Sequence, residues 1–245
     1  MISYGQNEGI SCLHKQAVSP LWRPDCAPPN CSVSSQMLYP FGEDFRTLVA
    51  RRCAAFTRIP ALDTHGLKRA AVAVTLVESD DRSGETAFVL TRRGRDLRAH
   101  KGQYALPGGR CEEGETADAA ALRELEEEVG LRLRADVVVG MLDDYPTRSG
   151  YLITPVVIWA EQAQQLLPNL EEVATVHRIP LAQIARADAI DFILIPESDR
   201  RVIRIRMNGF LVHAPTAAMI YQFHEVLAGR DTRIDDLEQP VFAWR

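Results

Sequence analysis

Apolar residues repeat with a helical period near the middle of the chain. Leu122, Leu125 and Val129 lie three and four positions apart, so a helix would bring them onto one face. Thr116 is suited to cap the start of this helix, and Gly130 is suited to end it. The pattern predicts an amphipathic helix whose apolar face joins the core.

Two further helices flank this central one. Residues 43–56 place five apolar side chains on one side of a helix, which predicts packing against the domain that follows. Residues 216–227 predict the second, with Pro215 at its start and Gly229 as its stop.

Runs of β-branched and apolar residues, separated by turn residues, predict strands. The runs are continuous rather than alternating, which indicates a sheet covered on both faces. The expected strands are residues 70–77, 86–93, 135–145, 151–160 and 173–179.

Residues 201–213 alternate between apolar and polar positions and predict a hairpin. Its turn is Asn208-Gly209, a pair typical of type I′ turns. The outward Arg201, Arg204 and Arg206 are interpreted as solvating an edge strand. The alternative is that they extend a positive surface toward a substrate.

Carboxylates gather on a second face of the central helix. Glu124, Glu127 and Glu128 lie three, four and one positions apart, and Glu126 adds a fourth charge. Like charges at this spacing destabilise a helix, so a counter-ion is expected. Carboxylate oxygens suit a hard cation, Mg²⁺ or Mn²⁺ rather than zinc. The alternative is a solvated acidic face.

A basic stretch precedes this helix. Its charged members are Arg92, Arg93, Arg95, Arg98, His100 and Lys101. Arginine makes bidentate contacts to phosphate, so the stretch indicates an anionic, phosphate-bearing substrate. An exposed basic loop without a ligand is the alternative. The adjacent Gly108 and Gly109 permit a tight turn that offers a backbone carbonyl to a metal.

Two later acidic pairs are also candidates for a catalytic role. Asp143 and Asp144 follow an expected strand, where loop solvation is the preferred interpretation over contact with the metal site. Glu171 and Glu172 precede another strand, and a late acidic contribution to catalysis is the minor alternative there.

Composition narrows the class of protein. The 245 residues are 46% apolar and 25% charged, enough for one globular domain with an extension. The net charge of −5 argues against a nucleic-acid partner. Five cysteines without repeating spacing suit a reducing cytoplasm, and the sequence shows neither a membrane-span nor a signal pattern. A homodimer remains an open alternative.

The order of these patterns suggests four segments. Residues 1–40 hold five prolines and no helix or strand period, so we expect an extended or partly disordered segment. Residues 41–64 form a helix and linker, and residues 65–230 form the main domain. Residues 231–245 are a tail that we expect to be ordered only if Phe242 and Trp244 dock.

The region from Gly109 to Leu131 resembles the Nudix box at nine specified positions. These are Gly109, Glu115, Arg123, Glu124, Leu125, Glu127, Glu128, Gly130 and Leu131. The resemblance implies an α/β fold, the Nudix α/β/α sandwich with a mixed central sheet. It also implies a loop-helix-loop that binds divalent cations and hydrolyses nucleoside diphosphate derivatives.

The same resemblance implies roles for individual residues. Glu124, Glu127 and Glu128 correspond to metal ligands, one of them the candidate base, and Gly108 would add its carbonyl. Arg123 corresponds to the residue that orients a carboxylate, with Glu115 as its structural partner. The remaining structural positions of the box are Gly109 and Gly130.

The basic stretch is similar to the signature that precedes the box in coenzyme A diphosphatases. LTR at 90–92, LR at 97–98, His100, GQ at 102–103 and PGG at 107–109 match it. Leu106, Arg93 and Tyr104 depart from it in bulk around the expected pocket. The resemblance implies substrate binding by a set of five residues: Arg92, Arg93, Arg98, His100 and Gln103.

The function expected from this resemblance is hydrolysis of the diphosphate in coenzyme A or its thioesters, giving 3′,5′-ADP and 4′-phosphopantetheine or its acyl derivative. Its partner would be a small nucleotide substrate. One alternative is a Nudix pyrophosphatase for ADP-ribose, NADH or another nucleoside diphosphate derivative. The other is a non-catalytic Nudix module that senses a ligand or binds a protein.

Overall fold

A mixed β-sheet lies at the centre of the protein. The computed structural model describes residues 39–59, 66–94, 102–161, 163 and 165–241. The strands follow the order β3-β2-β1-β7-β5, with β4 on β1, β6 on β7 and β8 on β2. β1 and β7 are parallel over nine residue pairs, while the other pairs are antiparallel. The predicted mixed sheet is confirmed.

The strands of this sheet are β1 (Lys68–Glu78), β2 (Thr86–Arg93), β3 (Tyr104–Ala105), β4 (Gly108–Arg110), β5 (Val138–Met141), β6 (Tyr145–Pro146), β7 (Tyr151–Trp159) and β8 (Val173–Pro180). The helices are α1 (Glu43–Ala55), α2 (Ala117–Val129), α3 (Leu181–Ile184) and α4 (Thr216–Leu227), with a 3₁₀ turn, η1, at Ala135–Val137. The predicted helices agree with α1, α2 and α4.

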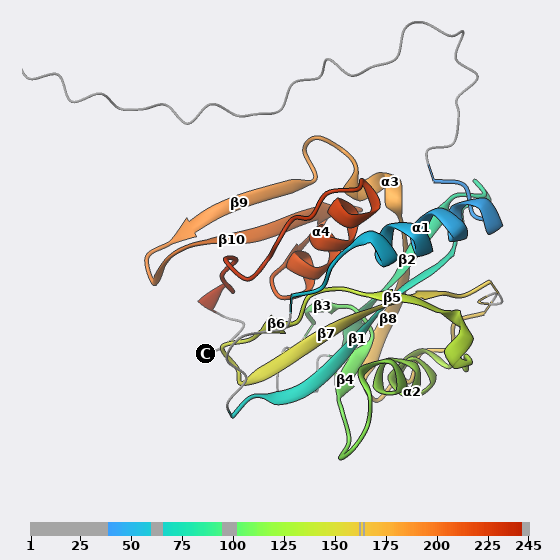
Figure 1. Ribbon diagram of the computed structural model, residues 1–245, viewed down its shortest axis with the longest axis horizontal. Helices are drawn as coiled ribbons and strands as arrows, with labels where there is room; N and C mark the ends of the chain where they lie inside the picture. Colours follow the sequence, from blue (N-terminus) through green and yellow to red (C-terminus); the bar gives the residue numbers. More distant parts are fainter. Residues whose placement is uncertain (1–38, 60–65, 95–101, 162, 164, 242–245) are drawn as a thin grey trace, which may run out of the picture. The chain divides into compact units, whose positions relative to one another are not determined.

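The sheet separates two apolar cores, one on each face. α2 packs on one face, where its Leu125 and Val129 are fully buried beside Ala71 and Val156. α1 and α4 cover the other face, with Val49 and other apolar residues of these helices meeting strand residues such as Leu76 and Trp159 (Figure 1). This arrangement is the α/β/α sandwich. The strands are continuously apolar because both faces of the sheet are covered by helices.

Helix α2 begins and ends as its sequence predicts. The Thr116 hydroxyl accepts a hydrogen bond from the Ala119 amide at 3.4 Å. Gly130 closes the helix in the left-handed conformation, with φ 68°. Its amide then donates to the Glu126 carbonyl at 3.1 Å. These local signals fix which helix face meets the sheet.

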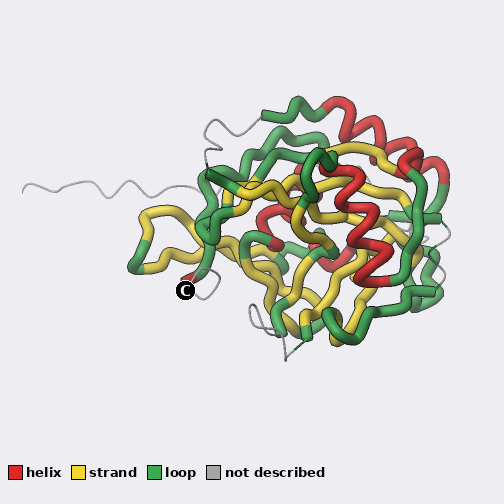
Figure 2. Tube along the Cα trace, turned by 90° about the horizontal axis from the view of Figure 1, so that it is seen from below, coloured by secondary structure: helices red, strands yellow, loops and turns green. Residues whose placement is uncertain are grey.

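A second, three-stranded sheet has the order β11-β10-β9. Its strands are β9 (Ile190–Ile195), β10 (Ser198–Met207) and β11 (Phe210–His213). The predicted hairpin is correct, but its first strand is central rather than an edge, because β9 pairs with it. Arg204 accordingly forms an ion pair with Asp191, and the Arg201 guanidinium lies over the Phe192 ring. β9 and β10 extend past the central sheet (Figures 1 and 2).

One further expectation needs correction, and another is left untested. The strand predicted over residues 135–145 is interrupted: it starts as the turn η1, and only β5 and β6 within it are strands. β5 carries a register shift against β7, so its pairing is irregular as well. The tail packs through Ile234 and Leu237, which are 1% and 4% exposed. Phe242 and Trp244, the residues expected to dock, lie outside the described residues, as do residues 1–38.

Asp143 and Asp144 are tied into the fold rather than solvated. Asp143 is buried and accepts hydrogen bonds from Gln222 at 2.8 Å and from Arg233 at 2.9 Å. Asp144 is paired with Arg58 at 2.7 Å. Both carboxylates therefore join α4 and the end of the α1 segment to the sheet, which corrects the expectation of loop solvation.

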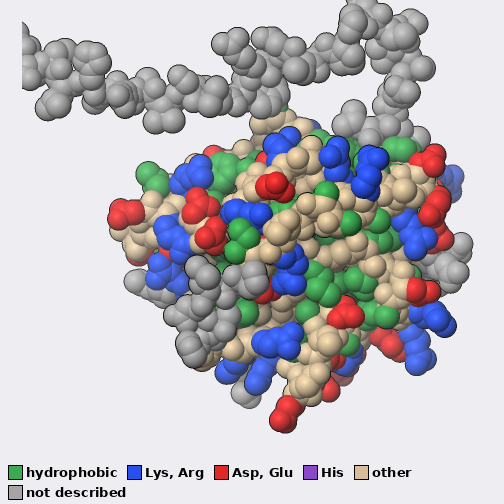
Figure 3. Space-filling model, in the orientation of Figure 1, with side chains coloured by type: hydrophobic (Ala, Val, Ile, Leu, Met, Phe, Trp, Pro, Cys, Tyr) green, Lys and Arg blue, Asp and Glu red, His purple; other side chains and the backbone are tan. Residues whose placement is uncertain are grey.

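Charges of both signs are interspersed on the face of the protein shown in Figure 3. Among the helices of the described residues, none combines the length and apolarity needed to cross a membrane.

Candidate active site

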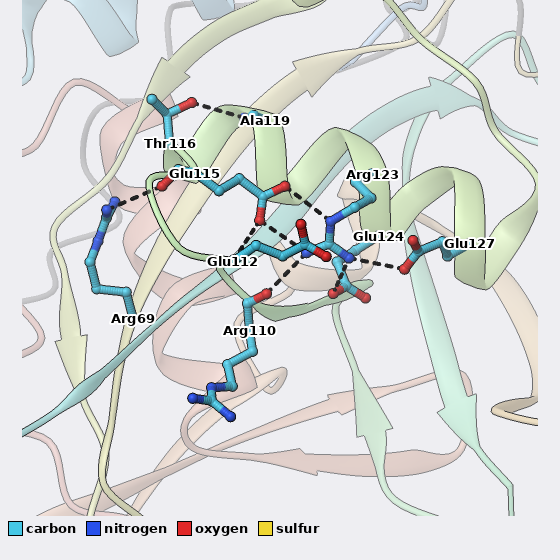
Figure 4. A network of polar contacts seen from close by, with 9 residues as sticks. All are labelled: Arg69, Arg110, Glu112, Glu115, Thr116, Ala119, Arg123, Glu124 and Glu127. Carbon is cyan, nitrogen blue, oxygen red and sulfur yellow. Dashed lines mark hydrogen bonds and ion pairs between the residues drawn. The ribbon is translucent and has the colours of Figure 1, made fainter.

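Arg123 is the centre of a network of carboxylates on α2 (Figure 4). Its guanidinium donates to Glu115 through two nitrogens, at 3.0 and 3.1 Å. A third nitrogen donates to Glu124 and to Glu127, each at 2.9 Å. The planar guanidinium thus holds three carboxylates at once, a geometry that a lysine could not reproduce.

The loop before α2 is fastened to the same arginine. The Arg110 carbonyl accepts a hydrogen bond from Arg123 at 3.0 Å, while the Arg110 side chain points away from the network (Figure 4). Glu115 also accepts from the Glu112 amide at 2.8 Å. Hydrogen bonding to Arg123 keeps the pKa of Glu115 below its usual value, so this carboxylate stays charged. Loop and helix therefore behave as one unit.

Two glycines let the backbone approach α2 and β1 closely. A Cβ on Gly109 would overlap the carboxylate of Glu124. A Cβ on Gly108 would overlap the backbone of Ala71 and Val72, and Gly108 has φ 155°. Glycine is required at position 108, where a Cβ would meet backbone atoms, whereas at position 109 a Cβ would force the flexible end of the Glu124 side chain to move. The glycine turn therefore lies directly against the carboxylates.

Glu128 is the most buried of the box carboxylates, with only 3% of its surface exposed. It accepts a hydrogen bond from the Gly108 amide at 3.3 Å and faces Arg93 at 3.9 Å. Burial raises its pKa to about 7, although Arg93 opposes the shift. A carboxyl group with this pKa exchanges protons near neutral pH, which suits acid-base chemistry.

Glu124 is also perturbed, and a further carboxylate acts on it. Burial raises the pKa of Glu124, and Arg123 opposes this shift. The negative charge of Glu172 is a smaller contribution that raises the pKa of both Glu124 and Glu128. Glu172 therefore belongs to the electrostatic surroundings of Glu124 and Glu128. Its role in catalysis stays a prediction.

The donor atoms can be compared with the needs of a metal ion. Within the residues that the structure describes, no three His, Cys, Asp or Glu side chains stand as a group that could hold one. One oxygen of Glu124 and one of Glu127 accept hydrogen bonds from Arg123, and one oxygen of Glu128 accepts a hydrogen bond from the Gly108 amide. The donor types nevertheless fit a hard divalent cation, since all are carboxylate or carbonyl oxygens. The ligand set remains a prediction.

A cavity of about 470 Å³ opens beside the glycine turn. One side is formed by β1, Gly108 and Gly109, and Arg93 lies at the same cavity. Further lining residues come from β3, the start of β7 and α4, among them Tyr104, Tyr151 and Met219. The cavity is thus partly apolar and borders the turn that contacts Glu124 and Glu128, which is the arrangement of a small-molecule site.

The predicted substrate-binding residues divide into three cases. Arg93 and Gln103 line the cavity. Arg92 does not line it, but its guanidinium lies 5.8 Å from the centre of the Tyr104 ring and donates to the Gly102 carbonyl at 3.3 Å. Arg98 and His100 lie outside the described residues.

Sequence reasoning missed the far wall of the cavity. Tyr151 begins a strand, while Thr216 and Met219 belong to a helix nearly ninety residues beyond the box. No local pattern marks these residues, because their helix is apolar on most of its surface and reads simply as core. Only tertiary packing brings them to the site.

Comparison with known proteins supports the family that the sequence resembles. Residues 67–197, more than half of the chain, match the family model described as the NUDIX domain. "Uncharacterized Nudix hydrolase NudL" of Escherichia coli K12 is 38% identical over 122 residues, which cover 49% of this chain and 62% of that protein. The protein of the same name from Photorhabdus laumondii is 33% identical over 138 residues, covering 55% of this chain and 74% of that protein.

Two further proteins resemble parts of the chain. Nudix hydrolase 22, chloroplastic, of Arabidopsis thaliana is 38% identical over 116 residues, covering 46% of this chain and 38% of that protein. A MutT/nudix family protein from Enterococcus faecalis has a TM-score of 0.44 at 17% identity, over 70% of this chain and 63% of that one. The chain spans about three fifths of the length of the E. coli relatives. By the family match over more than half its length, the chain belongs to the Nudix family.

Proposed function

We propose that the protein is a divalent-metal-dependent hydrolase of the diphosphate bond in coenzyme A or its thioesters. The products would be 3′,5′-ADP and 4′-phosphopantetheine or its acyl derivative. The observation that carries the hydrolase proposal is the glycine turn, which contacts Glu124 and Glu128 on one side and borders the cavity on the other. The coenzyme A specificity rests on the basic signature before the box.

Each side chain has a role that follows from its contacts. Mg²⁺ or Mn²⁺, held by Glu124, Glu127, Glu128 and the Gly108 carbonyl, would neutralise phosphate oxygens and acidify water. Arg123 orients Glu124 and Glu127 through the hydrogen bonds that it donates to both carboxylates. Glu128, with its pKa near 7, is suited to take the proton from the attacking water.

Arg93 is the residue that we expect to bind the phosphates. It lies at the cavity and faces Glu128, and its buried Nε has no hydrogen-bond partner among the residues that the structure describes. A buried donor without a partner costs free energy that a phosphate oxygen would recover. A phosphate bound to Arg93 would also bring the scissile bond next to Glu128. Part of the binding energy of the substrate would then serve to position that bond.

We expect the enzyme to prefer coenzyme A to dephospho-coenzyme A. The reason is the surplus of arginine and lysine in residues 92–101, which can engage the additional 3′-phosphate. Steady-state kinetics with Mg²⁺ would compare kcat/KM for the two compounds. Equal values would show that the enzyme makes no useful contact with the 3′-phosphate.

Two alternatives are separated by the same assay. A panel of ADP-ribose, NADH and coenzyme A, each with Mg²⁺, tests whether another nucleoside diphosphate derivative is preferred. A non-catalytic Nudix module would bind without cleaving any of them, but this chain keeps every carboxylate of the box. The substrate in each enzymatic case is a small nucleotide, and the cysteine content suits a cytoplasmic site of action.

A further inference from the structure

An aromatic cluster joins the small sheet to the wall of the cavity. Phe210, the first residue of β11, stacks on Tyr104 of β3 with ring centres 4.0 Å apart and planes inclined by 9°. The His177 ring, on β8, packs against both: its centre lies 5.7 Å from the centre of the Tyr104 ring and 5.6 Å from that of Phe210. Three strands that are far apart in sequence thus meet at one side chain of the cavity, Tyr104.

Tyr104 has little other support from its own strand. β3 is only two residues long and is held to β2 by the pairs Arg92 with Tyr104 and Thr91 with Ala105. It is followed within four residues by Gly108, which contacts Glu128. A short strand of this kind depends on side-chain packing for its position. Movement of Tyr104 would therefore reshape the cavity beside the glycine turn.

The support comes from a part of the chain that the family match does not include. The match ends at residue 197, whereas Phe210 and the cavity residues Thr216 and Met219 lie beyond it. This later segment shares one apolar core with the rest of the domain. The general Nudix chemistry thus resides in the matched region, and one wall of the cavity is supplied by residues peculiar to the C-terminal part.

We propose that Phe210 is a positioning residue for substrate binding. By stacking on Tyr104, it holds that ring at the cavity wall and so sets the affinity for the organic group attached to the diphosphate. Phe210 itself is not among the residues that line the cavity, so its effect passes through Tyr104. The inference rests on the proposed function, because it assumes that the cavity receives a substrate.

Phe210→Ala should raise KM for the cleaved diphosphate about three- to tenfold and leave kcat within about twofold. An aromatic pair contributes an energy equivalent to a fold-change of this size, and here it acts on binding rather than on the reacting groups. Phe210→Tyr keeps the ring and should restore the wild-type KM. Steady-state kinetics of the three proteins would show the effect.

Phe192→Ala is the matched control. Phe192 lies in the same small sheet, is partly buried and packs against Tyr221 with ring centres 5.7 Å apart, but it does not line the cavity and has no contact with Tyr104 among the ring pairs of the described chain. Its removal should lower thermal stability and leave KM unchanged. An equal rise of KM in Phe192→Ala and Phe210→Ala would mean that loosening the small sheet explains both, which would overturn the proposal.

A double-mutant cycle tests whether Phe210 acts through Tyr104. If it does, Phe210→Ala should add little to the KM of Tyr104→Ala, because the stacking partner is already gone. Additive effects, or an unchanged KM in folded Phe210→Ala, would contradict the proposal.

Calorimetry with the two products, 3′,5′-ADP and 4′-phosphopantetheine, separates this inference from the proposed activity. Phe210→Ala should bind at least one product three- to tenfold more weakly, whether or not the wild type cleaves coenzyme A. If the wild type binds a product but cleaves nothing, the proposed activity fails and the positioning role stands on that binding difference. Equal binding by wild type and Phe210→Ala, or no binding by the wild type, would overturn the positioning role.

Discussion

Glu128→Gln should lower kcat by about 10²- to 10⁴-fold, the usual effect of losing a general base. Glutamine has the same shape, so its side-chain oxygen can still accept the hydrogen bond that the Gly108 amide donates. It has no charge to attract a divalent cation and no carboxylate to take a proton at neutral pH. The change therefore removes the chemistry and keeps the packing. Glu127→Gln should act in the same direction, since Glu127 belongs to the same predicted ligand set.

Glu126→Gln provides the control for Glu128→Gln. Glu126 is on the same helix, but half of its side chain is exposed and it pairs at 3.5 Å with Arg132, away from the Arg123 network. Its loss should leave kcat unchanged, because exposed ion pairs contribute little. Circular dichroism and thermal melting would confirm that each variant folds. Wild-type turnover by folded Glu128→Gln would remove Glu128 from the mechanism.

Gly109→Ala should lower kcat by about 10²-fold while the protein remains folded. The added methyl group would overlap the Glu124 carboxylate, which is the flexible end of a side chain and has to turn away. A displacement of about 1 Å at a reacting group is enough for such a loss. Kinetics with saturating Mg²⁺ would measure it, and thermal melting would show that the stability is close to that of the wild type.

Gly42→Ala is a suitable comparison for Gly109→Ala. Gly42 has extended backbone, and a Cβ there would meet no atom within 4 Å. Activity and stability should both stay near wild type. Full activity in Gly109→Ala would mean that the position of the Glu124 carboxylate does not matter for turnover.

The parts of the fold that local chemistry determines were predictable from the sequence. Helix α2 has its cap, its apolar face and its terminal glycine within fifteen residues, so its bounds agree with the prediction, and Leu125 and Val129 are buried as expected. Leu122 is only partly buried, and Glu128, which was expected on the other face, is buried as well. The turn at Asn208 and Gly209 is similar, since both residues adopt positive φ as the pair requires. The contact between Arg123 and Glu127 follows from their spacing of four residues on α2, whereas the roles of Arg123 and Glu115 were expected only from the resemblance to the Nudix box.

The parts that depend on contacts between distant residues were not predictable. β9 was not predicted, because its sequence is a short apolar run without a distinctive pattern. Its pairing with β10 is what makes β10 a central strand. Asp143 looks like a solvated loop residue until α4 brings Gln222 to it. The cavity wall at Tyr104 and Met219 likewise exists only because three separate segments meet there.

The central claim is that the carboxylates of α2 support cleavage of a phosphoanhydride by water with the help of a divalent cation. The direct test is mass spectrometry of coenzyme A after incubation with the purified, metal-stripped protein, with and without added Mg²⁺ or Mn²⁺. The account predicts 3′,5′-ADP and 4′-phosphopantetheine in the presence of the metal and intact coenzyme A in its absence. Intact coenzyme A, ADP-ribose and NADH in the presence of either metal would contradict it.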